Sequence, residues 1–467
     1  MRKRIFWLLA LLVALALLAA QCGAAPTTAP EAAAPAEEEA APAEEAPAEE
    51  AAPAEEAAAP AEEEAAPAEE EAMAEATGET IKVYTSWPLQ GSMLPEGESM
   101  KNAVALALQH YLDDHGGVGP AGYDVEIVNL DDASPTTGSW DGTIEAENAQ
   151  RCVDDTDCQV YFGTYNSGAA KVSMPITNKA GIAHITPANT YPGLTKEWDA
   201  GEPTIYRPSG EVNYFRTNAS DDLQGWAGAA WASCLGFQKV YVLDDRQLYG
   251  KGVADAFIQQ AEKIGLEVVG RDGVESTDID FRALLTKIKA TSSDLVYGGF
   301  VIDSGGPQVI QQMASLGLFD DGVKFMGPDG LQNPALVEQV GGPDVANGNV
   351  YLTFPGLTGS QLSSEAGQRY YEDFQAGYGA EPSPWSTYAY QAMQVILNSI
   401  ERAGSKDRAA ILKAMREGEY DGITGQFSFN ENGDPTLINM GGYLVENGDP
   451  TNFLGPISPD MSESCPK

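Results

Sequence analysis

The sequence predicts an α/β protein with two lobes, each built on a doubly wound parallel sheet. From residue 80 onward, short apolar runs alternate with segments of about 10–15 residues whose apolar side chains recur at helical spacing. This alternation is typical of βαβ units, in which consecutive strands pair in parallel. Because a single sheet would be large for a chain of this length, we expect two lobes.

The expected elements follow one another along the chain up to residue 330. Strands are expected at 81–89, 123–132, 159–163, 182–188, 239–245, 266–270, 294–300 and 323–330. Helices are expected at 97–117, 143–153, 171–181, 224–236, 252–265, 281–290 and 307–317. In the first of these helices Val104, Leu108 and Tyr111 share one face, and Gly116 ends the segment.

The carboxyl-terminal part breaks this alternation. The hexapeptide ENGDPT occurs at 431–436 and again at 446–451, each time after a strand-like run. Asn-Gly and Asp-Pro are typical of turns, so we expect antiparallel strands joined by hairpins here. The duplication indicates two similar turns and not a repeated domain.

The amino terminus predicts export. Three basic residues at 2–4 precede an uninterrupted apolar stretch at 5–20, which indicates a secretory signal peptide over residues 1–21. The stretch is short for a membrane-spanning helix, which needs about 20 apolar residues. Cys22 resembles the lipidated cysteine of bacterial lipoproteins, although the residues before it depart from the usual pattern, and ordinary signal-peptide cleavage is the alternative. We expect an extracytoplasmic lipoprotein anchored to the cell membrane.

Residues 22–78 are almost wholly Ala, Pro and Glu, and the part from 31 to 75 contains 17 Glu and no Lys or Arg. Such a segment cannot bury a core and repels itself, so we expect a disordered, extended tether. The whole chain carries a net charge of −42. A chain this acidic lacks the clustered Lys and Arg that phosphate contacts need, which argues against a nucleic-acid partner.

The sequence contains few of the residues and motifs that catalysis or metal binding would need. It has only three histidines, and it contains neither a CxxC pair nor a GxSxG elbow. Ser167 and Ser304 have no evident histidine partner, since His184 lies in an expected strand and the other two histidines lie at one helix end. We therefore expect a protein that is not an enzyme and that needs no cofactor or metal.

Candidate ligand contacts follow the expected strands, because ligands in open α/β sheets lie beyond the carboxyl ends of the strands. Ser167 stands in GTYNSG, where a strand ends and the free N–H groups of a new helix favour an anion. Thr190, Asp221 and Asp329 also follow apolar runs. Helix capping is the alternative role for Ser167 and Asp221, and turn formation is the alternative for Asp329.

Together these stretches resemble the leucine/isoleucine/valine-binding protein family of periplasmic solute receptors, which has the type I periplasmic binding protein fold. Further stretches that carry the resemblance are DDHGGVGPAGYDVEIVNLDDAS, VLDDRQLYGKGVADAF, DLVYGGF and PWSTYAYQAM. The resemblance covers nearly all of 80–460 in the family's order. It implies a monomeric solute-binding protein with a three-strand hinge, which brings a branched-chain or other small amino acid to an ABC permease of the branched-chain type.

The resemblance also implies an amino-acid clamp. Ser167 and the N–H groups around it would hold the ligand α-carboxylate, and Thr190 would hydrogen-bond both α-substituents. The backbone carbonyl of Ala188 and the carboxylates of Asp221 and Asp329 would hold the ammonium. Asp329 stands where the branched-chain receptors have the longer Glu. The chemistry of these residue types agrees, since a zwitterion needs donors at one end and carboxylates at the other.

The side-chain pocket departs from the branched-chain pattern. The resemblance places three aromatic residues at pocket-lining positions: Tyr165, Tyr249 and Phe300. Asn166, beside the clamp serine, and Ser383, where close relatives commonly have an aromatic residue, differ from that pattern. Two tryptophans near the expected cleft fit the core as well as the site: Trp87 and Trp385. The alternative function is a receptor of the same fold that senses an amide, urea or an aromatic acid.

By analogy with the family, the chain crosses between the lobes three times, near 219–221, 354–356 and 440–442. Lobe 1 would then comprise residues 79–219 and 356–440. Lobe 2 would comprise residues 220–355 and 441–467.

Four cysteines follow Cys22, and an even number in an exported chain suggests two disulfides. Cys152 and Cys158 fall in lobe 1, and Cys234 and Cys465 fall in lobe 2. We expect each pair to form a bridge, because bridges within a lobe leave the hinge free to close.

Overall fold

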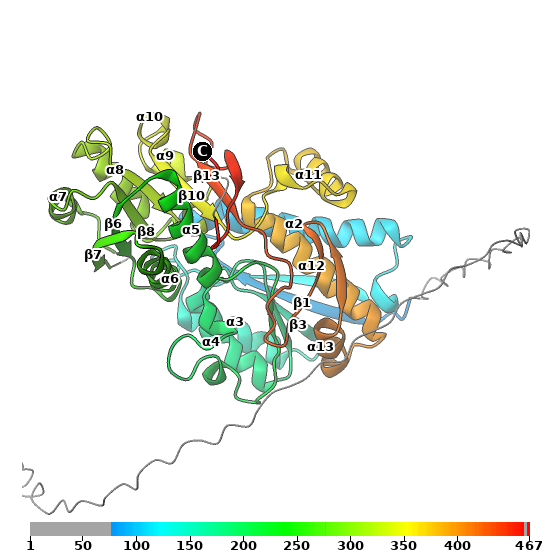
Figure 1. Cartoon of the computed structure of the whole chain (residues 1–467). Helices are drawn as coiled ribbons and strands as arrows, with labels where there is room; N and C mark the ends of the chain where they lie inside the picture. The colour runs from blue at the N-terminus through cyan, green and yellow to red at the C-terminus, as the bar shows by residue number, and fades with distance from the viewer. Residues whose placement is uncertain (1–75, 276, 462–464) are drawn as a thin grey trace, which may run out of the picture. The chain divides into compact units, whose positions relative to one another are not determined.

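The computed structural model describes residues 76–275, 277–461 and 465–467 (Figure 1). The expected signal peptide, Cys22 and the expected tether up to residue 75 lie outside these ranges. None of the described helices is both long enough and apolar enough to cross a membrane.

The first sheet has five parallel strands in the order β2-β1-β3-β4-β5. Its strands are β1 (Thr80–Trp87), β2 (Asp124–Asp131), β3 (Cys158–Gly163), β4 (Ala183–Thr186) and β5 (Tyr214–Arg216). Every residue of β3 and β4 is buried. Continuous burial of this kind is typical of central strands in a parallel sheet whose two faces are both covered.

Helices from two distant parts of the chain pack around this sheet (Figure 1). The crossovers between its strands supply α2 (Leu94–Asp114), α3 (Gly142–Asp154) and α4 (Ser167–Lys179). A later segment supplies α11 (Glu365–Tyr378), α12 (Pro384–Ala403) and α13 (Arg408–Arg416). α12 packs along α2, and α13 packs against β3 and β4. The start of α12 is thereby fixed beside the start of α2, far away in sequence.

The second sheet has seven strands in the order β14-β13-β10-β9-β8-β6-β7. They are β6 (Lys239–Asp244), β7 (Glu267–Gly273), β8 (Leu295–Gly299), β9 (Lys324–Gly327), β10 (Val350–Phe354), β13 (Gly441–Leu444) and β14 (Phe453–Pro456). β6 to β10 are parallel, whereas β13 and β14 add an antiparallel edge. The associated helices are α5 (Asp221–Leu235), α6 (Leu248–Ile264), α7 (Arg282–Lys289), α8 (Gly306–Ser315), α9 (Leu336–Gln339) and α10 (Pro343–Ala346).

The remaining described elements are short. A separate antiparallel pair consists of β11 (Glu419–Gly422) and β12 (Gly425–Ser428). Single 3-10 turns are η1 (Gly91–Met93), η2 (Pro120–Gly122), η3 (Pro192–Leu194), η4 (Thr204–Tyr206), η5 (Asp329–Leu331) and η6 (Gly359–Gln361). Two of these turns, η1 and η5, lie directly before α2 and directly after β9, where they position residues of the site described below.

Helix ends follow local side-chain chemistry. The Asp141 carboxylate accepts hydrogen bonds from the N–H groups of Thr143 and Ile144 at the start of α3. α12 begins with Pro384, whose fixed φ and missing N–H suit the first helical position. It ends at Gly404 in the left-handed conformation (φ 57°), which glycine adopts without steric cost.

The expected strands and helices up to residue 330 are confirmed, since each overlaps an observed element. Their boundaries differ: α4 begins at Ser167 and not at 171, which brings the serine into the helix itself. The second ENGDPT lies in the turn between β13 and β14, as expected. The carboxyl-terminal part is more helical than expected, because α11, α12 and α13 occupy most of 365–416.

The first ENGDPT turn supplies a buried ion pair to the first sheet. Asp434 in this turn accepts a hydrogen bond from Nε of Arg216, the last residue of β5, at 2.7 Å. Arg216 is fully buried and also donates to the backbone carbonyl of Tyr191 (3.0 Å). Removing one member of a buried pair strands the other charge, so this turn is tied to the sheet.

The cysteines meet in the expected pairs. Cys152 at the end of α3 is bonded to Cys158 at the start of β3, with 5.4 Å between their Cα atoms. Cys234 near the end of α5 is bonded to Cys465, with 5.7 Å between their Cα atoms. The lobe boundaries remain a prediction; the strands at 80–216 belong to one sheet and those at 239–456, except β11 and β12, to the other.

Candidate ligand-binding site

A cavity lies where the loops after several parallel strands meet α4 and α6. Its lining residues are Tyr165, Asn166, Ser167, Ala188, Tyr249, Val301, Asp329 and Gly330. They follow β3, β4, β8 and β9 or begin α4 and α6. The structure thus brings together six of the residues that the sequence singled out, from both sheets, at the carboxyl ends of strands, where ligands of α/β proteins bind.

The start of α4 forms one wall of this cavity. Ser167 is the first helical residue, and its Oγ accepts a hydrogen bond from the N–H of Tyr191 (3.3 Å). The N-cap position belongs to Asn166, so Ser167 does not act as the helix cap. A helix start with its backbone N–H groups directed outward favours an anionic group.

Trp140 covers this helix start. A Cβ atom on Gly168 would lie 2.5 Å from Cζ2 of the indole, so only glycine permits this close approach. The indole Nε1 of Trp140 donates to Oε1 of Gln247 (3.0 Å), which directly precedes α6. This contact links a loop of the first sheet with a loop of the second beside the cavity.

The loop after β4 is held rigidly against the cavity. The Oγ1 of Thr186 accepts hydrogen bonds from the N–H groups of Ala188 and Asn189 (3.1 Å each). The Asn189 side chain donates in turn to the carbonyl of Tyr165 (2.8 Å). Thr190 follows, fully buried, and its hydroxyl makes no hydrogen bond with any residue that the structure describes.

Asp329 forms part of the second wall, and the buried carboxyl group of Asp221 lies close to it. The Asp329 side chain is 3% exposed and accepts a hydrogen bond from the Tyr249 hydroxyl (3.0 Å). Asp221 begins α5, and its N–H donates to the carbonyl of Thr190 (2.8 Å). Neither carboxyl oxygen of Asp221 has a hydrogen-bond partner within the described ranges, so its side chain does not cap α5.

Burial sets the protonation of this pair. It raises the pKa of Asp221 well above its usual range, and the neighbouring Asp329 carboxyl raises it further. Burial also raises the pKa of Asp329 to about 7, opposed by the side chains of Gln224 and Tyr249. The Thr190 hydroxyl lies close enough to lower the pKa of Asp221, although it lacks the geometry of a hydrogen bond. A cation between the two groups would favour their charged form.

Three predicted contacts do not line the cavity. Thr190 and Asp221 are joined to each other by the backbone hydrogen bond, and Asp221 lies close enough to the lining residue Asp329 for the two carboxyl groups to interact electrostatically. Phe300 is fully buried and packs against α8, behind the residues that line the cavity. A Cβ atom on Gly306, the first residue of α8, would lie 2.9 Å from the Cβ of Phe300. The following residue, Val301, lines the cavity instead.

The sequence did not single out Tyr297, which lies near both acids. Its ring stacks on Phe257 at 3.9 Å between centroids, and its buried hydroxyl finds no partner in the described part of the chain. Burial raises the pKa of Tyr297, and the charges of Asp221 and Asp329 add to the rise. In DLVYGGF it looks like any aromatic residue of a core strand, so no local signal marked it.

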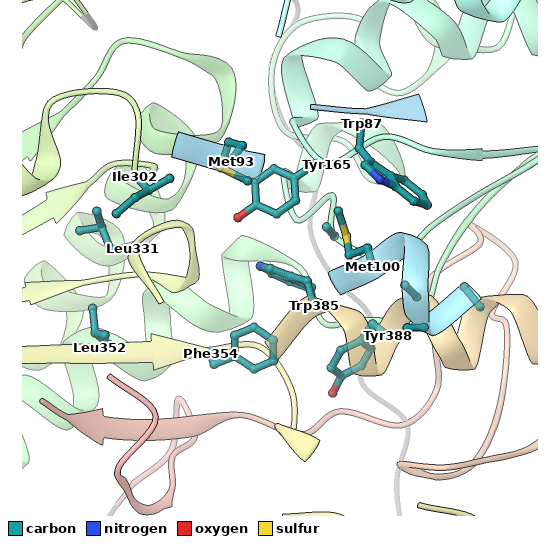
Figure 2. Close-up of a cluster of buried hydrophobic side chains, with 14 of the residues drawn as sticks. Trp87, Met93, Met100, Tyr165, Ile302, Leu331, Leu352, Phe354, Trp385 and Tyr388 are labelled. Carbon is teal, nitrogen blue, oxygen red and sulfur yellow. The ribbon is translucent and has the colours of Figure 1, made fainter. Parts of the chain in front are cut away.

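The two tryptophans separate into different roles. The indole of Trp87 is buried in the core and donates to the carbonyl of Gly97 (3.1 Å). Trp385 lies edge-on to Tyr165, with 6.4 Å between ring centroids, and so borders a residue that lines the cavity (Figure 2).

The chemistry of the described residues gives no sign of a reactive centre here. His184 is buried between Thr177 and the carbonyl of Gly163, and burial lowers its pKa to about 3. Ser304 donates to Asp245 (2.6 Å). Nowhere in the described ranges do three or more His, Cys, Asp or Glu side chains gather in a way that could hold a metal ion.

The sequence pattern of the periplasmic binding proteins matches residues 80–446. The chain belongs to the periplasmic binding protein family. Members of this family are extracytoplasmic solute-binding proteins and not enzymes.

Two curated relatives of this periplasmic binding protein come from Pseudomonas aeruginosa. An amino acid binding protein is 29% identical over 359 residues, which cover 77% of this chain and 87% of the relative. A leucine-, isoleucine-, valine-, threonine- and alanine-binding protein is 28% identical over 358 residues, covering 76% of this chain and 87% of the relative.

A similar solved structure is that of the leucine binding protein LivK from Thermotoga maritima. It matches with a TM-score of 0.69 and 26% identity, over 81% of this chain and 99% of that one. The type I fold expected for this periplasmic binding protein is thus confirmed.

Proposed function

We propose that this protein binds a branched-chain or other small amino acid in the cleft between its lobes and delivers it to an ABC permease. One observation carries the proposal: a helix start suited to an anion and the desolvated carboxyl group of Asp329 line the same cavity, and the buried carboxyl group of Asp221 lies close enough to Asp329 for its pKa to be raised by it. An α-amino acid carries the complementary charges, a carboxylate and an ammonium group, on one carbon atom.

Each end of the zwitterion would have its own partners. The α-carboxylate would lie at the N–H groups of α4 beside Ser167, in the favourable field of the helix. The ammonium would lie between Asp221 and Asp329, with the Thr190 hydroxyl and the Ala188 carbonyl as further contacts. Ser167 follows a strand of the first sheet, whereas Asp221 and Asp329 belong to the part of the chain that forms the second, so a ligand held at both of its ends would stabilise the closed arrangement of the two sheets.

The same acids argue against the alternative ligands to different degrees. An aromatic acid would bring a carboxylate without an ammonium, and two buried carboxyl groups would be left without a counter-charge. Urea or an amide could donate hydrogen bonds to the acids but would leave the start of α4 without an anion. The names of the two relatives, both amino-acid-binding proteins, support the zwitterion.

A thermal-shift screen of the purified protein against the amino acids, acetamide, urea and benzoate tests the proposal. A ligand at about a hundred times its Kd stabilises the folded state by roughly 2.7 kcal/mol, which is readily measured as a rise in Tm. We expect a rise with at least one α-amino acid and none with benzoate. A rise with urea or acetamide alone would favour the sensor of amides.

The membrane anchor and the tether belong to the same proposal. The signal peptide followed by Cys22, and the acidic segment after it, would hold the binding domain near the permease on the outer side of the membrane. Support for this part comes from the sequence pattern.

A further inference from the structure

Glu96 is a buried acid at the start of α2 that the site described above does not use. Its side chain is 0% exposed, and its Oε1 accepts a hydrogen bond from the hydroxyl of Ser383 (2.6 Å), directly before α12. Its second oxygen, Oε2, has no hydrogen-bond partner within residues 76–275, 277–461 and 465–467. The backbone N–H of Trp385 also lies close enough to lower the pKa of Glu96, but Oε2 is left without a hydrogen bond of normal geometry.

Trp385 offers an unpaired donor in the same region. Its side chain is 1% exposed, and its Nε1 makes no hydrogen bond of normal geometry within the described chain. Figure 2 shows the indole nitrogen turned toward the side on which the Tyr165 hydroxyl lies, and away from Tyr388. Tyr165 lines the cavity, so the unpaired N–H belongs to a side chain that packs against the cavity lining.

The electrostatics tie Glu96 to the cavity as well. Burial raises the pKa of Tyr165, and among the charges that add to this rise Glu96 is the largest and Asp329 the next. Tyr165 is therefore close to both Glu96 and Asp329. The indole N–H of Trp385 opposes the rise, which places it near the Tyr165 oxygen.

A water-excluding environment makes these two unpaired groups informative. Figure 2 shows apolar side chains around this wall, among them Met93, Ile302 and Leu331, and each of them is buried. Buried donors and acceptors are nearly always paired in native proteins. An unpaired acceptor and an unpaired donor beside the same lining residue thus suggest a ligand group that supplies both partners.

We infer that Glu96 and Trp385, with Tyr165, form the side-chain subsite, and that it takes an amino acid whose side chain ends in a neutral group that both donates and accepts hydrogen bonds. A carboxamide or a hydroxyl meets this requirement: it would accept from Nε1 of Trp385 and donate to Oε2 of Glu96. Glu96 is then a specificity-determining residue. The inference rests on the proposed function, because Ser167, Asp221 and Asp329 are taken to hold the α-carbon substituents.

A branched alkyl side chain would leave both groups unpaired in a closed site. Sites built to hydrogen-bond a ligand reject the analogue that lacks the polar group much more strongly than an apolar pocket rejects a missing methylene. We therefore expect a polar neutral amino acid to bind at least tenfold more tightly than leucine.

Calorimetric titration with L-glutamine, L-asparagine, L-threonine and L-leucine tests this inference. Trp385→Phe removes the N–H and keeps an aromatic ring, and it should weaken the best polar ligand at least fivefold more than it weakens leucine. Glu96→Leu should remove the preference for the polar ligand over leucine. The Kd of glutamine or asparagine, compared with that of threonine, shows whether the subsite prefers a carboxamide or a hydroxyl group.

The matched control is Glu145→Gln. Glu145 is equally buried, and burial raises its pKa to about 7 as it does that of Glu96. It accepts hydrogen bonds from Ser86 (2.6 Å) and Tyr161 (2.9 Å) under the first sheet, away from the cavity. Its ligand preference should match that of the wild type whatever its Tm.

The outcomes separate the inference from the function beneath it. Leucine binding as tightly as every polar ligand, with the same ratio in Trp385→Phe, would overturn the subsite and leave the amino-acid receptor intact. Folded wild-type protein that binds none of the four amino acids would overturn the proposed function, and the subsite with it. If Glu96→Leu does not fold, the ratio of the Kd values of leucine and the best polar ligand in Trp385→Phe alone decides whether the subsite exists.

Discussion

The Tyr249 hydroxyl donates a hydrogen bond to Oδ1 of Asp329 at 3.0 Å and accepts one from the N–H of Gly330 at 2.9 Å. Tyr249 belongs to α6, whereas Asp329 opens the turn after β9. The Tyr249 hydroxyl thus holds the turn in place, and it occupies one of the two carboxyl oxygens of Asp329. Asp329 lines the cavity, and its hydrogen bond with Tyr249 fixes the orientation of its carboxyl group there, which lowers the entropy cost of binding a ligand.

Neutralising either acid should weaken binding. Hydrogen bonds to charged groups contribute about 1.5–3 kcal/mol, and about 1.4 kcal/mol is one decade in Kd. Asp329→Asn and Asp221→Asn should therefore bind the amino acid at least roughly tenfold more weakly in calorimetric titration of the folded proteins.

Asp222→Asn is the control for this pair. Asp222 follows Asp221 in α5, but its carboxylate forms an ion pair with Lys196 (2.8 Å), and it does not line the cavity. It should bind the ligand normally. Wild-type affinity in Asp329→Asn would remove Asp329 from the site and reopen the case for a ligand without an amine.

Ligand affinity should rise with pH between about 5 and 7. Burial holds the pKa of Asp329 at about 7 in the ligand-free protein, and an ammonium partner would lower it again. Below that pKa, binding must displace a proton, so Kd should increase by up to about tenfold for each pH unit below 7. Calorimetry at pH 6 in two buffers of different ionisation enthalpy should show proton release.

The stability of the ligand-free protein should change with the opposite sign. Asp329 keeps its proton in the folded state up to about pH 7, whereas the unfolded chain ionises it near its ordinary value of 3.8. The free energy of unfolding should therefore fall as pH rises through this window. Asp329→Asn should lose the pH dependence of Kd, and a pH-independent Kd in the wild type would contradict the assignment.

Much of the fold and the site was predictable because the relevant signals are local. Apolar periodicity marked the elements up to residue 330, and Ser167, Ala188 and Asp329 follow strands whose carboxyl ends meet by topology alone. The helix α12 was missed even though Ser383-Pro384 at its start and Gly404 at its end are ordinary boundary signals.

Other features had no local signal to read. Glu96 stands in the polar stretch PEGES and looks exposed, yet it is buried by a hydrogen-bonding partner 287 residues away. Phe300 and Val301 are both apolar residues after β8, and only the tertiary packing of Gly306 and Gly330 decides which of them reaches the cavity. Non-local burial of this kind cannot be inferred from periodicity.

Cys22→Ser tests the anchor. If Cys22 carries lipid, the variant should appear in the medium or the periplasm and not in the membrane fraction after cell fractionation. The released protein should bind its ligand with wild-type affinity, because residue 22 lies outside residues 80–446, which match the family pattern. Membrane retention equal to that of the wild type would rule out lipidation at this cysteine.

The pairing of the cysteines can be tested by peptide mapping without reduction. The mapping should recover 152–158 and 234–465 as linked pairs, and a 158–234 link would overturn both the pairing and the lobe boundaries.

The two disulfides should differ in how much they stabilise the protein. The first bridge spans 6 residues and the second spans 231. A bridge constrains the unfolded chain more when the loop is longer, and bridges typically contribute roughly 2–4 kcal/mol. Replacing Cys234 and Cys465 by Ala should therefore lower the free energy of unfolding more than replacing Cys152 and Cys158. Both double variants should retain the wild-type Kd, because each bridge would lie within one lobe, and a weakened Kd in either would show that its bridge spans the hinge.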